Sequence, residues 1–176
     1  MAQTITPTGV ELFFDKDEII VSKTDLKGRM TYTNRVFMRI AGYEEKELLG
    51  EPHSMIRHPD MPRCVFKLLW DTLAAKKEIF AYVINMSKNG DHYWVLAHVT
   101  PSFDGSGNVI GYHSNRRVPD KDVIEKTITP LYKKLLAEEQ RHKSRKEGMN
   151  SAYQMLLDLL KEKGIGYDEL IFSLQS

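Results

Sequence analysis

The stretch IFAYVINMSKNGDHYWVLAHVTPSFDGSGNVIGYHSNRRV, residues 79–118, decides the fold of this chain. It contains three runs rich in β-branched and aromatic residues, at 79–86, 92–103 and 109–118, and this composition favours β-strands. The two connections between them contain the Asn-Gly and Gly-rich sequences that are typical of hairpin turns. We therefore expect three consecutive antiparallel strands.

The residues before this stretch predict a second hairpin followed by helices. EIIVSK (18–23) and RMTYTN (29–34) are separated by a turn containing Asp and Gly, which indicates two paired strands. Helical spacing begins after Asn34, which can cap a helix, and stops at Gly42. It continues in YEEKELLG (43–50) and resumes in a longer helix from Pro62. This order predicts an α+β fold in which helices gather on one face of an antiparallel sheet, with a ligand pocket between the two layers.

Beyond residue 118 the composition shifts to helix formers and charged residues. Asp120 can cap a helix with apolar residues at spacings of four, three and four, although Pro130 must kink or split that helix. The charged run EEQRHKSRKEG (138–148) is expected to lie in solvent and to end at its glycine. A last helix, ending at Gly164, should bury one side formed by Met149, Tyr153, Leu156 and Leu160.

Charge and composition exclude several classes of protein. The chain has 25 basic and 24 acidic side chains, so its net charge of +1 gives no general attraction to nucleic acid or to anionic membranes. A single cysteine excludes an internal disulfide framework, and the first 20 residues lack the pattern of a secretory signal. No apolar window approaches the roughly 18 residues that span a bilayer, so we expect a cytoplasmic protein without membrane insertion.

The turn SMIRHPDMPRCVFKLLW (54–70) holds Arg57, His58 and Asp60 at a helix entrance. Prolines on either side of Asp60 fix φ and make the segment stiff. One interpretation is that the turn presents an arginine fork and an imidazole to a planar or anionic ligand. The other is that Asp60 caps the helix and Arg57 pairs with it on the surface, contributing about 0 to 1 kcal/mol. Spacing alone favours the second interpretation.

Polar strand residues are further candidates for the pocket. Asn85, His98 and Ser114 could orient a ligand there, but strand alternation says which residues share a face without saying which face is inside. Trp70 is a candidate ring-stacking wall, although core packing is the commoner role for such an aromatic residue.

Enzymatic and metal sites are not indicated. The six histidines lack the paired spacing on one helix that is typical of metal sites. No base is placed in the sequence to activate Cys64, whose apolar neighbours suggest burial. We therefore expect neither a metal site nor an enzyme.

Three stretches together resemble the PAS sensor domain of bacterial aerotaxis receptors: AGYEEKELLGEPHSMIRHPDMPRCVFKLLW (41–70), KNGDHYWVLAHVTP (88–101) and GYHSNRR (111–117). The resemblance covers about residues 18–135. It implies a PAS fold, in which a five-stranded antiparallel sheet cups noncovalently bound FAD whose redox state reports electron flow. It also implies that flavin binding needs Arg57, His58 and Asp60, and that Asn34 and Asn85 contribute to binding or signalling.

The chain departs from that family in two places and in length. Ile79 and Phe80 stand where the family usually has a Pro-Trp pair, and Met86 and Ser87 stand where it has a basic pair. The membrane anchor, HAMP unit and methyl-accepting domain of these receptors are not in the sequence. It therefore resembles more a PAS-only subunit of a bipartite energy-taxis system, of the CetB type, although a piece of a longer receptor would look similar.

The resemblance predicts an N-terminal cap segment (1–17), a PAS sensor domain (18–118) and C-terminal signalling helices (119–176). Reduction of FAD would shift the sheet, and the helices would then engage a methyl-accepting chemotaxis-type membrane receptor or its HAMP region, with a homodimer as a further expectation. Two alternatives stay open. One is a haem-based gas sensor with a histidine ligand in the pocket, and the other is an interaction module whose pocket is filled by side chains.

Overall fold

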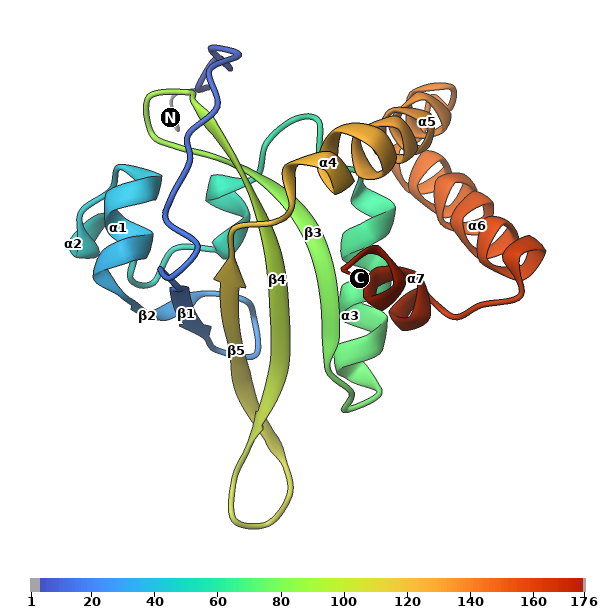
Figure 1. The fold of residues 1–176 in the computed structure, drawn as a ribbon. Coiled ribbons are helices and arrows are strands. Elements are labelled where there is room, and N and C mark those ends of the chain that lie inside the picture. Colours follow the sequence, from blue (N-terminus) through green and yellow to red (C-terminus); the bar gives the residue numbers. More distant parts are fainter. Residues whose placement is uncertain (1–3, 176) are drawn as a thin grey trace.

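In the computed structural model, which describes residues 4–175, five strands form one antiparallel sheet in the order β2-β1-β5-β4-β3 (Figure 1). The strands are β1 (Ile20–Thr24), β2 (Met30–Thr33), β3 (Ile79–Met86), β4 (His92–Phe103) and β5 (Val109–Arg117). Both predicted hairpins are confirmed, and β5 joins them because it pairs with β1 on one side and with β4 on the other. The predicted α+β fold with a five-stranded antiparallel sheet is therefore correct.

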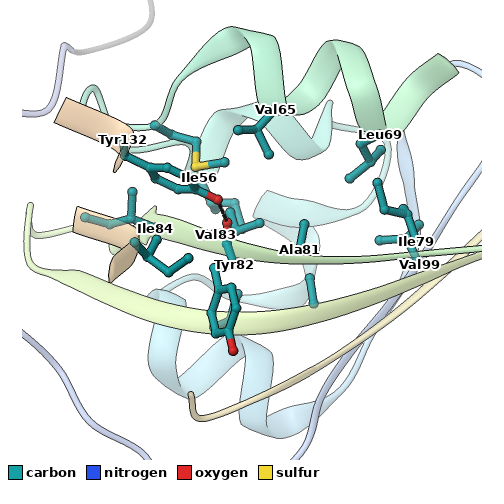
Figure 2. Packing of buried hydrophobic residues seen from close by; sticks show 14 of the residues in the cluster. Ile56, Val65, Leu69, Ile79, Ala81, Tyr82, Val83, Ile84, Val99 and Tyr132 are labelled. Atoms are coloured by element: carbon teal, nitrogen blue, oxygen red, sulfur yellow. Dashed lines mark hydrogen bonds between the residues drawn. The ribbon is translucent and has the colours of Figure 1, made fainter. Parts of the chain in front are cut away.

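Four helical segments connect β2 to β3: α1 (Arg35–Ala41), α2 (Glu45–Leu48), the 3-10 helix η1 (His53–Ile56) and α3 (Arg63–Ala74). The helix predicted after Pro62 is thus α3, which packs against β3. Figure 2 shows Leu69 of α3 opposite Ile79 and Val99, whereas Tyr82 of β3 points away from α3. The alternation of β3 therefore gives it one face toward α3 and one face away from it.

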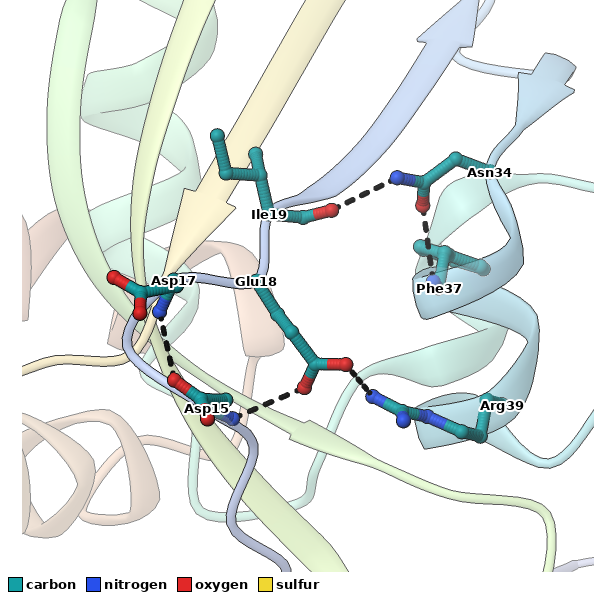
Figure 3. A network of polar contacts seen from close by, with 7 residues as sticks. All are labelled: Asp15, Asp17, Glu18, Ile19, Asn34, Phe37 and Arg39. Carbon is teal, nitrogen blue, oxygen red and sulfur yellow. Dashed lines mark hydrogen bonds and ion pairs between the residues drawn. The ribbon is translucent and has the colours of Figure 1, made fainter.

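The start of α1 follows from its sequence. Asn34 Oδ1 accepts a hydrogen bond from the backbone N–H of Phe37 at 3.0 Å, and its amide donates to the carbonyl of Ile19 at 2.8 Å (Figure 3). Oδ1 also accepts from the N–H of Val21 at 3.1 Å. Asn34 is therefore both an N-cap and a link between α1 and β1. Gly42 ends the helix in the left-handed conformation at φ 74°, as the sequence predicted.

The N-terminal segment runs beside the start of β4 (Figure 1). The N–H of Thr8 donates to the carbonyl of Gly90 at 3.0 Å, and that of Leu12 donates to the carbonyl of His92 at 2.7 Å. Phe14 is buried in the core. This segment is thus attached to the sheet by backbone hydrogen bonds, while the boundary at residue 17 stays a prediction.

The C-terminal helices lie beside the edge strand β3 and the helix α3 (Figure 1). They are α4 (Lys121–Val123), the π-helix η2 (Ile124–Ile128), α5 (Thr129–Gln140), α6 (Arg145–Lys163) and α7 (Tyr167–Leu174). The Tyr132 hydroxyl donates to the backbone carbonyl of Tyr82, so α5 also contacts the backbone of the edge strand (Figure 2). This cover protects an edge that would otherwise be open to pairing with another chain.

Pro130 does not split the helix, which was one of the two effects predicted for it, because a π-helical turn precedes it and α5 continues through it in its first turn. Three other details of this region differ from the prediction. The charged run does not end at Gly148, because α6 begins at Arg145 with Ser144 as its cap. The helix α7 was not predicted. On α6, Leu156 and Leu160 are buried as expected, whereas the other buried positions are Gly148 and Ala152 rather than Met149 and Tyr153.

Within residues 4–175, no helix combines the length and the apolar character needed to cross a bilayer.

Candidate functional site

A cavity of about 350 Å³ lies between the sheet and α3. Its apolar wall comes from α3 and from two strands, and consists of Phe66, Leu69, Trp70, Leu73, Val83, Ala97 and Val99. Its polar groups include Ser22, Thr24, Lys27, His53, Ser54, Arg57, Asn85, Ser114 and Arg116. The cavity is therefore mostly apolar with a few placed polar groups, the composition of a small-molecule site, and it lies between the layers as predicted.

The strand alternation determines which polar groups reach this cavity. Ser114 and Arg116 of β5 lie two residues apart and therefore share a face, and the same holds for Ser22 and Thr24 of β1. On β3 the inward position is taken by Asn85, which is 3% exposed. The structure thus settles the facing that the sequence left open.

Four of the predicted site residues line the cavity: Arg57, Trp70, Asn85 and Ser114. The guanidinium of Arg57 lies 3.9 Å from the ring centroid of Phe66, and its Nε is buried without a hydrogen-bond partner among the described residues. Burial lowers the pKa of Arg57, and the nearby charge of Arg63 lowers it further. Arg57 and Asn85 also form an isolated antiparallel bridge, which fixes the turn against the edge strand.

Four other predicted residues lie outside the cavity lining. Asn34 caps α1, and Asp60 is exposed. His58 is buried, but its Nδ1 accepts from the N–H of Asp60 at 3.0 Å and its ring lies beside His92. These contacts shape the turn that carries Arg57, and flavin binding by these residues stays a prediction.

His98 was a candidate pocket residue whose facing the sequence left open, and it does not line the cavity. It lies on the outer face of β4, where its ring stacks on that of Phe80 at 4.1 Å and its Nε2 lies 2.8 Å from a carboxylate oxygen of Glu78. The reason is the alternation of β4, which places Ala97 and Val99 inward and the residue between them outward.

The surface interpretation of Arg57 and Asp60 is also wrong. The N-cap of α3 is Pro62, with no side-chain cap, so Asp60 does not cap the helix. A carboxylate oxygen of Asp60 lies 3.9 Å from Nδ1 of His58, and the guanidinium of Arg57 contacts the ring of Phe66 instead. The prolines therefore direct Arg57 inward rather than along the surface.

The most informative polar cluster was missed from the sequence. Arg116 Nη1 donates to His53 Nε2 at 2.8 Å, and Arg116 Nη2 donates to Ser22 Oγ at 2.6 Å. Ser22 Oγ and His53 Nε2 are 3.2 Å apart. Because Nε2 accepts from the arginine, His53 is neutral with its proton on Nδ1. The sequence signal for this cluster was GYHSNRR, where two arginines are adjacent on one strand. Because neighbouring strand residues point to opposite faces, one of the two arginines faces inward.

Arg116 is a buried cation without an acidic partner. It is 2% exposed, and no carboxylate within residues 4–175 lies within 4.0 Å of it. Burial lowers its pKa to about 10, and its guanidinium also lies over the ring of Phe37 at 4.8 Å. Burial together with the charge of Arg116 lowers the pKa of the partly buried His53 to about 3. The cluster therefore holds one positive charge at the cavity wall.

The whole lining is biased toward positive charge. Lys27, Arg57 and Arg116 line the cavity, and among the lining residues that the structure describes none is acidic. An uncompensated buried charge is costly, so this arrangement suits a ligand that carries negative charge or electron-rich oxygen and nitrogen atoms.

The positions where the chain departs from aerotaxis receptors do not line this cavity. Ile79 belongs to the core, and Phe80 stacks on the outer face. Met86 is buried, and the Ser87 hydroxyl donates to the carbonyl of Ile40 at 2.7 Å. These departures therefore replace none of the residues that line the cavity.

The cavity wall is connected to the C-terminal helices through α3. The backbone N–H of Cys64, in the first turn of α3, donates to Glu139 Oε1 of α5 at 2.9 Å. A carboxylate from α5 thus occupies the position that an N-cap side chain would take, and it favours the positive charge of Arg57 nearby. The same carboxylate and burial raise the pKa of the Cys64 thiol to about 12.

Comparison with known proteins agrees with the fold. Residues 30–116 match the family model described as PAS fold. The chain is 42% identical over 122 residues to the aerotaxis receptor of Escherichia coli K12, a match that covers 69% of this chain and 24% of that receptor. It is 27% identical over 120 residues to the nitrogen fixation regulatory protein of Klebsiella pneumoniae, covering 66% of this chain and 24% of that protein.

The solved structures show the same architecture. The dark structure of the blue-light photoreceptor Aureochrome1 LOV superimposes with a TM-score of 0.56 at 20% identity, covering 65% of this chain and 86% of that one. The chain spans about a quarter of the length of the two curated relatives. The sheet, the family model and these likenesses together show that the chain has a PAS fold.

Proposed function

We propose that this chain is a redox sensor whose PAS domain binds FAD noncovalently in the cavity. The observation that carries the proposal is the buried guanidinium of Arg116, which has no carboxylate partner within the described chain and lies at the wall of an apolar cavity. A ligand whose electron-rich ring edge gains negative charge on reduction would compensate this positive charge. The relatives support this reading, since one is named an aerotaxis receptor and another a nitrogen fixation regulatory protein.

The side chains of the cavity fit a flavin. Phe66 and Leu69 of α3 and Val99 of β4 are apolar groups on opposite walls, able to enclose a flat ring and exclude water. Asn85 and Ser114 supply an amide and a hydroxyl that can hydrogen-bond the polar edge of the ring. The bound flavin would supply the electron-transfer chemistry, and the cationic groups would set how readily it is reduced.

A haem-based sensor fits the cavity less well. His53 is the histidine among the described lining residues, and its Nε2 already accepts a hydrogen bond from Arg116. A metal ligand on that nitrogen would have to displace the arginine. The cofactor-free alternative requires side chains to fill the pocket, whereas a cavity of about 350 Å³ lies within the usual size range of ligand sites.

The output of the sensor would pass through α3 to the C-terminal helices. Arg57 lines the cavity, and Glu139 of α5 accepts from the first turn of α3 while favouring the charge on Arg57. A change of charge on a ligand in the cavity would alter how strongly Arg57 interacts with that ligand and with Glu139. The two redox forms would therefore favour different positions of α5. We propose that these helices signal to a methyl-accepting chemotaxis-type receptor or its HAMP region. The chain would then act in the cytoplasm as a subunit of the CetB type, alone or as a homodimer, and not as an enzyme.

Redox-dependent proteolysis tests this function. The protein is reconstituted with FAD and digested with trypsin under anaerobic conditions before and after photochemical reduction of the flavin. We expect cleavage at the exposed basic residues of the α5–α6 connection, such as Arg141 and Lys143, to change in rate on reduction. Cleavage at Lys76, on the exposed turn after α3, serves as the internal control. A cleavage rate at Arg141 and Lys143 that stays the same when the flavin is reduced would refute the coupling.

A further inference from the structure

We infer that the mouth of the cavity is a phosphate site, in which Lys27 of the β1–β2 turn binds the phosphate-bearing tail of a phosphorylated flavin. This inference rests on the proposed function and extends it to a residue outside the motifs of the resemblance. It concerns a chemical group that riboflavin lacks and that FMN and FAD share.

The position of the mouth follows from the exposure of the lining residues. Arg116 and Asn85 are 2% and 3% exposed, so the cavity is closed where they lie. Trp70 is 41% exposed, and Lys27 and Ser54 are exposed as well. A volume of about 350 Å³ lies near the lower end of the roughly 300 to 1,000 Å³ usual for ligand pockets, so it encloses a ring system rather than a whole dinucleotide. The remaining tail of the ligand must therefore leave past Lys27.

The turn that carries Lys27 is held in place at this mouth. Asp25 Oδ1 accepts from the N–H groups of Lys27 (2.8 Å) and Arg29 (2.9 Å), which closes the turn. Gly28 has φ 77°, and its carbonyl accepts from the N–H of His53 at 2.9 Å. A Cβ on Gly28 would lie 3.5 Å from the indole of Trp70, so the turn and α3 meet at the mouth.

Lys27 is available for an anion. Within residues 4–175 it forms no ion pair with a carboxylate within 4.0 Å. Its ammonium is a mobile point charge suited to phosphate oxygens, and Ser54 and Gly28, which line the mouth beside it, are uncharged. The carboxylate of the turn, Asp25, does not line the cavity, and its Oδ1 accepts from backbone N–H groups. Among the cationic residues that line the cavity, Arg116 is buried and Arg57 is partly buried, so Lys27 of the β1–β2 turn is the exposed cation at the mouth.

The test compares three flavins on one apoprotein. Riboflavin, FMN and FAD are titrated separately at low salt, with flavin fluorescence as the readout, into the wild-type protein and into the variants Lys27→Gln and Lys23→Gln. Lys23 is the matched control, because it lies four residues away on the outer side of β1, over the ring of Tyr32. Circular dichroism verifies that each variant is folded.

We expect wild-type protein to bind FMN and FAD more tightly than riboflavin. Lys27→Gln should weaken binding of both phosphorylated flavins about tenfold, the change expected for loss of one charge-assisted hydrogen bond, and should leave riboflavin unchanged. Lys23→Gln should change none of the three. Equal wild-type affinities for the three flavins, or an equal loss for riboflavin in Lys27→Gln, would overturn the phosphate site and leave flavin binding intact. Failure of all three flavins to bind would refute the proposed function itself.

Discussion

Arg116 carries a buried positive charge with no acidic partner in the described chain. Its guanidinium has two good hydrogen bonds, to His53 and Ser22, but its Nε is buried without a partner in the described chain. Replacement by methionine keeps the length of the side chain and removes the desolvated charge. The effects of this change on stability and on binding should therefore have opposite signs.

We predict that Arg116→Met raises the free energy of unfolding of the ligand-free protein by about 1 to 3 kcal/mol. The same change should weaken FAD binding about tenfold or more, because the compensating charge is lost. Urea unfolding measures the first quantity, and fluorescence titration measures the second. Arg117→Met is the matched control, since Arg117 is exposed and should alter neither. A destabilised Arg116→Met variant with normal FAD affinity would assign Arg116 a structural role instead.

His53 predicts a pH dependence of stability. Its pKa falls from 6.5 to about 3 in the folded protein, so between these values the unfolded chain binds more protons. The free energy of unfolding therefore rises with pH through this window and falls on acidification. We predict that wild-type protein loses about 1 to 2 kcal/mol more than His53→Gln between about pH 7 and about pH 5. Urea unfolding at the two pH values measures this difference, and parallel losses in both proteins would contradict the assigned burial.

Cys64 should be chemically inert in the folded protein. Burial, reinforced by the carboxylate of Glu139, raises the pKa of its thiol to about 12, so the reactive thiolate is scarce near pH 8. We expect no reaction with a thiol-specific chromogenic reagent under native conditions and one equivalent of reaction after unfolding in urea. Rapid labelling of the native protein would show that the first turn of α3 opens readily.

At the residue scale, predictions succeeded where local chemistry was sufficient. Asn34 and Gly42 mark the two ends of α1, as predicted, because capping depends on a few neighbouring residues. The facing of Ser114 and His98 was undetermined, since both faces of this sheet carry polar and apolar side chains. Arg116 was missed because an arginine on a strand is usually exposed, and only the assembled sheet brings it to Ser22 and His53.

At the scale of elements, α3 depends on α5 for part of its N-terminal hydrogen bonding. Pro62 provides no side-chain cap, and the carboxylate of Glu139 takes that place from another helix. We predict that Glu139→Ala lowers the free energy of unfolding by about 1 kcal/mol, as loss of a cap does, and speeds tryptic cleavage of the C-terminal helices. Glu162→Ala, an exposed change near the end of α6, is the control. Unchanged cleavage in Glu139→Ala would mean that this contact does not hold α5 to the domain.

The crossing of α5 and α6 requires a glycine. A Cβ at Gly148 would lie 2.2 Å from the backbone carbonyl oxygen of Glu139, a contact that only a shift of one helix can relieve. We predict that Gly148→Ala lowers the free energy of unfolding by about 1 to 3 kcal/mol, whereas Gly105→Ala, which meets nothing within 4 Å, changes it little. Thermal unfolding of the two variants gives the comparison. A Gly148→Ala variant as stable as wild type would show that the crossing adapts freely.

Element boundaries were predicted best where turns are sharp. The hairpins follow from Asn-Gly and Gly-rich connections, and their strands agree closely with the observed bounds. The C-terminal helices were predicted less well, because Ser144 was hidden in a charged run and Gly148 is used for packing rather than to end a helix. The short α7 is held by Leu170 and Ile171 in the core and by Phe172 against Phe80, which are tertiary contacts that no local pattern reveals.

At the scale of the whole molecule, the helix α3 contacts both the cavity and the C-terminal helices. The face of α3 with Phe66, Leu69 and Trp70 lines the cavity, while α6 and the carboxylate of Glu139 contact it from the C-terminal side. The C-terminal helices also cover the edge strand β3, whose residue Asn85 lines the cavity. The cavity and the C-terminal helices thus share the same two elements, as the proposed coupling between them requires.

The absorption spectrum of the purified protein tests the central claim most directly, together with heat release and chromatographic identification of any chromophore. The account predicts the two absorption bands of an oxidised flavin and the release of FAD, or the appearance of these bands when the colourless protein is incubated with FAD. A Soret band, or a colourless protein that binds neither added FAD nor added FMN, would contradict it.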